Sequence, residues 1–526
     1  MSTYLDFLSV ANMLTIGLCM GGLLAAVVAR WLRRWQNPKC NGVLPPGSMG
    51  LPFVGETLGL IIPSASLDLP PFIKTRIKKY GPIFRTNLAG RPMIVTADRE
   101  FNHFLLRQDG KLVDTWSLDT FAEVFDQTTQ SSRKYTRNLT LNHFGIEALR
   151  GNLLPKMENA INDTLRAWSS QESTEVKSAA ITLTIDFASK QLFSGDLDDA
   201  PLKLSDMFNH LVDGLMSFPL NIPGTAHHKC LKVHKQVREM MSDVLRKRRS
   251  SSEKREDLLH HLINDMDTGD FLSEGFIIQL MFGLLFVSSD SISTTCALAF
   301  KFLFEHPTVL DELIAEHVHI LEKKENTDSP LTWNDYKSMT FTLQVINEVL
   351  RLGNISPGLL RRALQDIPIN GYTIPEGWVI LLASAALHLN PDEFEDPLTF
   401  NPRRWKTWQF ETRIHEIVRD TTRHEYTTRI HLKNGDKAYF YSCIRFVSIS
   451  SLTRDLNSSV VAKSFMPFGS GMKQCAGSEY SRVFLATFLH VLVTKYRWEL
   501  VKGGKIVRAP IIRFPHGFHY KITAKT

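Results

Sequence analysis

The stretch Phe465-Met-Pro-Phe-Gly-Ser-Gly-Met-Lys-Gln-Cys-Ala-Gly477 decides the fold of this chain. Its single cysteine, Cys475, follows a glycine-bearing loop and precedes an amphipathic run. Glycines at 469, 471 and 477 allow positive φ and let the backbone approach a flat partner closely. Loop amides and the start of the following helix favour a thiolate. The stretch is therefore suited to hold a sulfur anion against a large planar group.

Two other interpretations of this stretch have to be weighed. A lone cysteine in a long intracellular chain is most often a small buried hydrophobe. Gly469-Ser470-Gly471 with Lys473 also resembles part of a phosphate-binding loop. However, Gln474 stands where a third glycine would be needed, and no apolar strand leads into the loop. The context of the stretch has to decide between these interpretations.

Length and composition limit the class of protein. The 526 residues could form two or three domains or one large α-rich enzyme. A chain that is 43% hydrophobic and 22% charged is globular, and the net charge of +7 suits an acidic partner protein or an anionic membrane surface. We expect no nucleic-acid partner, because the basic residues are not concentrated on one element. The six cysteines lack CxxC pairs, which predicts neither a disulfide framework nor a zinc site.

The N-terminus carries a nearly unbroken apolar run from Phe7 to Ala29, which is long enough to cross a bilayer. A cleaved signal peptide is the alternative, but the apolar run is too long and no basic residue precedes it. Arg30, Arg33 and Arg34 follow the run at once. The positive-inside rule then places residues 1–6 in the lumen and the rest of the chain in the cytosol.

We therefore divide the chain into a lumenal N-terminus (1–6), a transmembrane signal anchor (7–29), a basic and proline-rich hinge (30–52) and one large domain (53–526). The predicted location is the endoplasmic reticulum membrane, with a single pass and a cytosolic domain. Short apolar runs with turn signals predict strands within Tyr80 to Ala97, and helical spacing dominates from about 98 to 350. The fold class is mainly α with small β-sheets.

A long apolar stretch from Gly275 to Phe304 contains Asp290 and several hydroxyl side chains in its middle. A second transmembrane helix is one interpretation. An acid inside an apolar helix costs several kcal/mol unless it is satisfied, so it tends to mark function. Serine, threonine and aspartate at such a position can also bend the helix, because they compete for its carbonyls.

Two pairs of charged residues stand at helical spacing. Glu348 and Arg351 lie three residues apart between leucines, so the pair is expected to face inward and to need a third partner. Arg133 and Arg137 lie four residues apart and face the same way, for which a solvated basic face is the default interpretation.

The pattern Phe468-Gly-x-Gly-x-Lys473-x-Cys475-x-Gly477 resembles the haem-binding loop of the cytochrome P450 family, the haem-thiolate monooxygenases. Three further motifs of that family lie upstream in the expected order, and the resemblance extends from about residue 40 to the C-terminus. It implies a cytochrome P450 fold preceded by one N-terminal transmembrane helix. It also implies haem b (iron protoporphyrin IX), with Cys475 as the axial ligand of the iron.

The resemblance assigns the cofactor-binding residues. Phe468, Gly471 and Gly477 would shape the loop around Cys475, and Arg137, Arg361 and Lys473 would contact the haem propionates. Two departures from the family pattern weaken this set: Arg133 stands where an aromatic ring or histidine is expected, and Lys473 carries the charge of an arginine without its forked geometry.

The three upstream motifs assign catalytic and structural residues. Val287-Ser-Ser-Asp290-Ser291 is similar to the family's oxygen-binding helix, so Asp290 and Ser291 would relay protons for the oxygen chemistry. Here Ser291 replaces the usual threonine. Phe400-Asn-Pro-Arg-Arg404-Trp405 is similar to the segment that supplies the third partner, so Glu348, Arg351 and Arg404 would form the family's structural triad.

The segment 406–464 is longer than the family's usual spacing, and we place an atypical insertion at about 407–454. Strand-like runs there flank an Asn434-Gly435 hairpin signal. A surface insertion, a retained intron and an imperfect gene model all explain it, and we favour one of the last two. Because loops accept insertions at small entropic cost, the fold would tolerate it, although it could hinder haem loading or reductase docking.

The function that the resemblance implies is insertion of one oxygen atom from O2 into a C–H bond of a hydrophobic polycyclic substrate. Electrons would come from NADPH through NADPH-cytochrome P450 reductase. The motifs are most similar to the plant branch that oxidises sterols, triterpenoids and brassinosteroids. The alternatives are a non-catalytic haem- or sterol-binding form inactivated by the 406–464 insertion, and an isomerase or lyase of the same family.

Overall fold

The computed structural model describes residues 2–125, 130–195, 204–251, 253, 255–266, 272–326, 329–406, 463–509 and 511–525. The expected insertion at about 407–454 lies outside these residues. The chain forms two units. The first comprises residues 1–64, 69–116 and 358–383, and the second comprises residues 65–68, 117–357 and 384–526.

The first unit is built around a five-stranded sheet with the strand order β1-β2-β8-β5-β3. Strands β2 and β8 pair in parallel, and the other pairs are antiparallel. The β1–β2 hairpin confirms the strands expected between Tyr80 and Ala97, and its turn residues Ala89 and Gly90 both have positive φ. The elements of this unit are α1 (Ser2–Gln36), α2 (Thr57–Ile61), α3 (Pro71–Tyr80), β1 (Ile83–Leu88), β2 (Arg91–Thr96), α4 (Arg99–Arg107), β3 (Val113–Thr115), β5 (Leu359–Ala363), β6 (Ile367–Ile369), β7 (Tyr372–Ile374) and β8 (Val379–Leu382).

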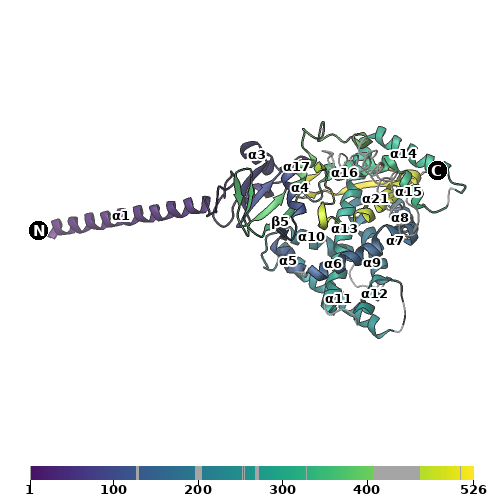
Figure 1. Ribbon diagram of the computed structural model, residues 1–526, viewed down its shortest axis with the longest axis horizontal. Helices are drawn as coiled ribbons and strands as arrows, with labels where there is room; N and C mark the ends of the chain where they lie inside the picture. The colour runs from purple at the N-terminus through teal and green to yellow at the C-terminus, as the bar shows by residue number, and fades with distance from the viewer. Residues whose placement is uncertain are drawn as a thin grey trace, which may run out of the picture. The chain divides into compact units, whose positions relative to one another are not determined.

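Helix α1 begins the chain as one continuous helix and runs through the basic residues to Gln36 (Figure 1). Its described apolar side chains up to Leu32 are exposed: Leu18 and Leu23 each keep 71% of their surface. Its last turn is tied to the hinge, because Trp35 Nε1 and Gln36 Nε2 donate to Gly50 O at 3.1 and 2.8 Å. The segment after the helix is therefore folded back onto it.

The second unit is predominantly helical, as expected. Its helices are α5 (Asp119–Val124), α6 (Gln130–Phe144), α7 (Ile146–Ala148), α8 (Leu154–Ser169), α9 (Val176–Phe193), α10 (Leu204–Leu215), α11 (Ala226–Ser250), α12 (Leu258–Asp265), α13 (Glu274–Glu305), α14 (Pro307–Glu322), α15 (Trp333–Ser338), α16 (Thr340–Gly353), α17 (Ser384–His388) and α21 (Ser478–Lys495). Its strands are β4 (Thr174–Glu175), β9 (Tyr496–Gly503), β10 (Val507–Arg508), β11 (Ile512–Arg513) and β12 (Phe518–Ala524).

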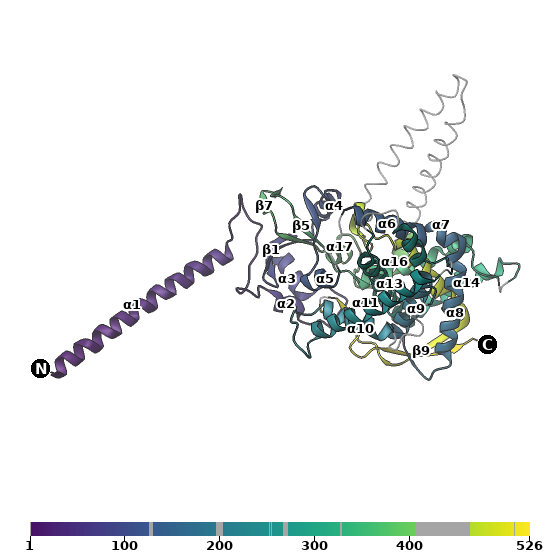
Figure 2. The same cartoon turned by 90° about the horizontal axis from the view of Figure 1, so that it is seen from below.

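Helix α13 lies at the centre of this second unit, in contact with α9, α11, α14, α16 and α21 (Figures 1 and 2). Ser273 caps its start by accepting from Phe276 N at 3.2 Å. Helix α13 is long and apolar enough to cross a membrane, and half of its apolar window is buried. Its contacts with five helices are those of a core helix, so the interpretation as a second transmembrane helix is not supported.

Candidate active site

The Cys475 loop is a series of turns that ends at the first residue of α21. Gly469 and Gly471 have φ of +68° and +74°, a backbone region that favours glycine. Gly469 N donates to Met466 O at 3.1 Å, and Cys475 N donates to Phe468 O at 2.9 Å. Cys475 therefore stands just before the N-terminus of α21, where the sequence predicts it.

Two opposing influences act on the Cys475 thiol. The surrounding protein removes water and raises the pKa of this thiol, even though the side chain is exposed on its open side. The backbone N–H of Gly477 and the Arg137 guanidinium lower the pKa of the same thiol. Arg137 reaches the loop from α6, where its Nη1 donates to Gln474 O at 2.6 Å. Arg137, which the sequence analysis predicts for this site, therefore contacts the loop directly.

The other residues predicted for the loop are distributed around it. The Arg482 guanidinium lies 4.9 Å from the centre of the Phe468 ring. A Cβ on Gly477 would lie 3.9 Å from Cys475 Sγ, so this position adjoins the sulfur. Lys473 is exposed at the end of the Gly471–Lys473 turn. Arg133, which replaces the expected ring, is exposed on α6.

A buried histidine fixes the entrance to the loop. His388 Nε2 accepts from Met466 N at 3.0 Å, and its Nδ1 donates to Asn354 Oδ1 at 2.6 Å. Because Met466 N is a donor, His388 must be neutral with its proton on Nδ1. Burial, aided by the nearby Arg351 charge, lowers the pKa of His388 to about 3. Sequence reasoning missed this residue, which carries no motif of its own.

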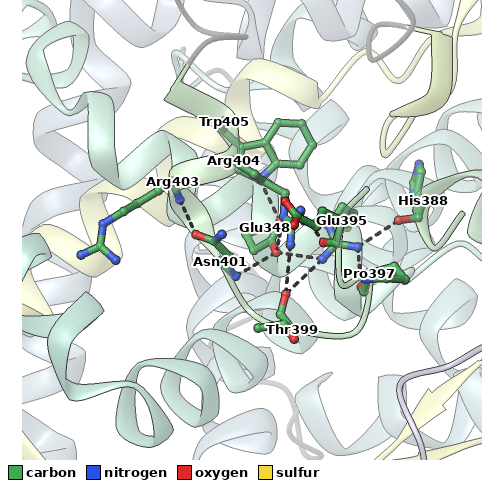
Figure 3. Close-up of polar contacts among 10 residues, drawn as sticks. Glu348, His388, Glu395, Pro397, Thr399, Asn401, Arg403, Arg404 and Trp405 are labelled. Carbon is green, nitrogen blue, oxygen red and sulfur yellow. Dashed lines mark hydrogen bonds and ion pairs between the residues drawn. The ribbon is translucent and has the colours of Figure 1, made fainter. Parts of the chain in front are cut away.

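Glu348 is the centre of the buried polar cluster in Figure 3. Its carboxylate accepts from Arg351 at 2.8 and 2.9 Å and from Arg404 Nε at 3.1 Å. It also accepts from Asn401 N at 3.0 Å and Trp405 Nε1 at 2.9 Å. The three charged residues expected to meet are therefore in contact. Asn401 and Trp405 were missed, although both lie in the segment that was singled out for Arg404.

This cluster also supports the cysteine loop. Arg351 Nη1 donates to His388 O at 3.0 Å, and the Trp405 ring lies 4.3 Å from the Phe465 ring. Both contacts support the start of the loop. Trp405 packs directly against Phe465, and His388 accepts a hydrogen bond from Met466 N. The Glu348 cluster thus holds the backbone from which Cys475 projects.

Asp290 and Ser291 lie on adjacent sides of α13. Asp290 Oδ1 is 3.2 Å from Lys177 Nζ, which comes from the start of α9. Ser291 is exposed and donates to Val287 O at 3.3 Å, and Val287 keeps 62% of its surface. This exposed face stands out on a helix whose other positions are mostly buried. Sequence reasoning missed Lys177, because a partner on another helix leaves no local signal.

Arg361 lies on β5 of the first unit, where it is almost fully buried. Its Nε and Nη2 face the two oxygens of Asp109 at 3.1 and 3.2 Å, and its Nη1 donates to Leu360 O at 3.0 Å. Asp109 was not predicted. The guanidinium thus already faces one carboxylate, and its Nε makes no hydrogen bond among the described residues.

The donor set around Cys475 fits a haem. In the part of the chain that the structure describes, no group of three or more His, Cys, Asp or Glu side chains could cage a metal ion. A single exposed thiol beside an arginine suits a metal that brings its own ring of ligands and negatively charged side groups.

A mainly helical fold with small sheets, a central helix with an internal acid, and one thiol in a glycine loop define a cytochrome P450. The model of that family, described as cytochrome P450, matches residues 45–418. The chain belongs to the cytochrome P450 monooxygenases.

Relatives align with nearly the whole chain. It is 42% identical to the cucurbitadienol 11-hydroxylase of Siraitia grosvenorii, over 98% of this chain and 100% of the relative. It is 40% identical to the beta-amyrin 16-alpha-hydroxylase of Maesa lanceolata, over 98% and 100%. It is 30% identical to the cholesterol 16,22-dihydroxylase of Trigonella foenum-graecum, over 99% and 98%. The retinoic acid-bound cyanobacterial CYP120A1 has the same fold, with a TM-score of 0.73 at 21% identity over 92% of this chain and 100% of that one.

Proposed function

We propose that this protein hydroxylates a sterol- or triterpenoid-type alcohol, using O2 and electrons that NADPH-cytochrome P450 reductase takes from NADPH. The observation that carries the proposal is the nearly full-length similarity to hydroxylases whose names give cucurbitadienol, beta-amyrin and cholesterol as substrates. The non-catalytic alternative gains no support from the comparisons or from the described residues, and we do not retain it.

Each candidate residue then has a proposed task. Haem b bound through a thiolate supplies the oxidising chemistry, because the thiolate donates electron density that favours O–O cleavage. Cys475 provides that thiolate, and Phe468, Gly471 and Gly477 shape the loop that presents it. The propionates are proposed to be held by Arg137, Arg361 and Lys473.

Proton delivery is assigned to Asp290 and Ser291. The hydroxyl of Ser291 lies on the exposed face of α13, so it can hold a proton next to a bound substrate. Asp290 is paired with Lys177, and both side chains keep about a quarter of their surface. Because such partly exposed pairs are weak, the carboxylate can leave Lys177 and exchange a proton with Ser291.

The proposed topology assigns residues 7–29 of α1 to the membrane, with 1–6 in the lumen, 30–52 as the hinge and 53–526 as the cytosolic catalytic domain. The exposed apolar side chains of α1 and the three arginines near its C-terminal end support a single pass through the endoplasmic reticulum membrane. The proposed catalytic domain includes the atypical insertion at about 407–454.

The test is turnover by the full-length chain in microsomes that contain a plant reductase, supplied with cucurbitadienol, β-amyrin or cholesterol. We expect an NADPH-dependent product that is heavier by one oxygen atom. A second sample lacks residues 407–454 and shows whether this segment limits activity. Absence of such a product in both samples, with the haem spectrum intact, would contradict the proposed substrate class.

A further inference from the structure

Gln279 of α13 carries a buried side-chain amide. The side chain is 7% exposed, and its Nε2 donates to Val124 O, at the end of α5, at 2.9 Å. Because a carbonyl oxygen can only accept, the amide nitrogen has to face Val124, which leaves Oε1 as the other atom. Oε1 has no hydrogen-bond partner among the described residues. A buried amide oxygen without a partner costs folding free energy, so it calls for an explanation.

Open space lies beside Gly283, one turn further along α13 from this amide. A Cβ added at Gly283 would lie within 4 Å of no other atom. Helical side chains lean toward the N-terminus, so the space that a side chain at 283 would fill lies toward Gln279. Val287, 62% exposed, and the exposed Ser291 continue the row at intervals of four residues. The row spans about 18 Å along the helix axis from Gln279 to Ser291.

Aromatic rings pack together near Gln279, next to Val124 in the chain and one turn along α13. Phe282 and Phe286 of α13 pack against Phe125, with ring centres 5.4 and 5.2 Å apart, and against Phe208 at 5.9 and 6.4 Å. The ring of His234 lies 4.9 Å from Phe282. Among phenylalanine rings, a neutral acceptor binds a neutral hydroxyl in preference to an ammonium group, whose charge would stay uncompensated.

We propose that Gln279 Oε1 accepts a hydrogen bond from the hydroxyl of the substrate, and that the apolar skeleton of the substrate lies along Gly283 and Val287 toward Ser291. The substrate is then an elongated apolar alcohol, oxidised at the end remote from that hydroxyl. Gln279 is a specificity-determining residue. This inference rests on the proposed function, because that function places the oxidised carbon near Ser291.

The test compares an alcohol with its 3-deoxy analogue in the haem-loaded full-length protein. Cucurbitadienol, β-amyrin and cholesterol are first titrated, and binding is followed by the spectral shift of the ferric haem. For the skeleton that binds, we expect the alcohol to bind about three- to tenfold more tightly than its 3-deoxy analogue. Gln279→Met removes the acceptor at similar size, so the ratio of the two Kd values should fall to about one.

Gln344→Met is the matched control, because Gln344 is buried to the same extent on α16. It should leave the ratio unchanged. Loss of the Val124 contact in Gln279→Met weakens both ligands together and cancels in the ratio. A wild-type protein that does not distinguish alcohol from deoxy analogue overturns the inference, as does an unchanged ratio in Gln279→Met. Failure of all three alcohols to bind overturns the proposed substrate class itself.

Discussion

Glu348 is fully buried and accepts hydrogen bonds from two arginines, one indole and one backbone amide. Glu348→Gln keeps the size of the side chain but removes its charge and turns N–H groups toward donors. Because it leaves the buried Arg351 without a carboxylate, we expect the free energy of unfolding to fall by about 3–5 kcal/mol. Urea denaturation followed by the haem absorbance measures this loss.

Glu312 supplies the control for this prediction. It pairs with Arg403 at 2.6 Å on the surface, where both side chains are exposed. Glu312→Gln should cost at most about 1 kcal/mol. Equal effects of the two substitutions would show that burial does not distinguish these ion pairs.

The low pKa of His388 predicts a pH dependence of stability. The pKa is lowered to about 3, mainly by burial, so the unfolded chain takes up this proton first as the pH falls. The stabilising contribution of neutral His388 is therefore complete above pH 6.5 and is lost progressively between about pH 6.5 and 3. In this range His388→Gln should show a slope of unfolding free energy against pH that is smaller by up to about 1.4 kcal/mol per unit. Identical slopes for the wild type and His388→Gln would refute the predicted contribution of His388 to this pH dependence.

The sequence predicted a residue when its partners share a motif with it. Glu348, Arg351 and Arg404 were expected together because two motifs of fixed spacing carry them, and the structure brings them into contact. Lys177 and Asp109 were missed, because each meets its partner across a long separation in the chain. Such pairs are set by packing of whole elements, which local spacing does not encode.

At the scale of elements, the C-terminal hairpin is attached to the end of α16 by one buried cation. Arg508 of β10 donates to Gly353 O at 3.1 Å and to Leu352 O and Asn354 O at 3.4 Å. Burial lowers its pKa to about 10, partly offset by Asp68, so it stays charged at neutral pH. A cation at the C-terminus of a helix is favoured by the helix dipole.

Arg508→Met should therefore lower the free energy of unfolding by about 2–3 kcal/mol, because charged hydrogen bonds to the α16 carbonyls are lost. Thermal unfolding of the holoenzyme measures it. Arg513→Met, on β11 of the same hairpin, removes an exposed pair with Asp213 and should change stability by at most about 1 kcal/mol. If Arg508→Met leaves the free energy of unfolding unchanged, this attachment contributes nothing to stability.

Turn signals and hydrophobic periodicity predicted the positions of strands and helices. They did not predict whether a given helix lies in the protein core or in a membrane. The strands within Tyr80 to Ala97 were located by their turn signals, and β1 and β2 occupy those positions. The apolar stretch from 275 to 304 left two interpretations open, since a core helix and a membrane helix have the same composition. Contact of α13 with five other helices decides between them, and that information exists only in the folded chain.

At the scale of the whole molecule, α1 is predicted to attach an otherwise independent enzyme to the membrane. Deleting residues 2–36 should move the protein from the microsomal to the soluble fraction while the haem spectrum persists, because the exposed apolar surface of this helix is removed. Centrifugation and absorbance measure the two properties. A truncated protein that stays in the membrane fraction would call for a second attachment.

The predicted orientation has its own check at Asn138, an exposed residue that begins an Asn-Leu-Thr sequon on α6. A cytosolic domain does not meet the glycosylation machinery, so endoglycosidase treatment should leave the mobility of the protein unchanged. A shift that Asn138→Gln abolishes would place this domain in the lumen.

The central claim is that Cys475 binds the haem iron through its sulfur. The most direct measurement is the carbon monoxide difference spectrum of the reduced full-length protein, compared with that of Cys475→Ser. We expect the Soret band of a thiolate-ligated haem in the wild type and loss of that band in the variant. A variant that keeps the band and its oxidising activity would contradict the central claim.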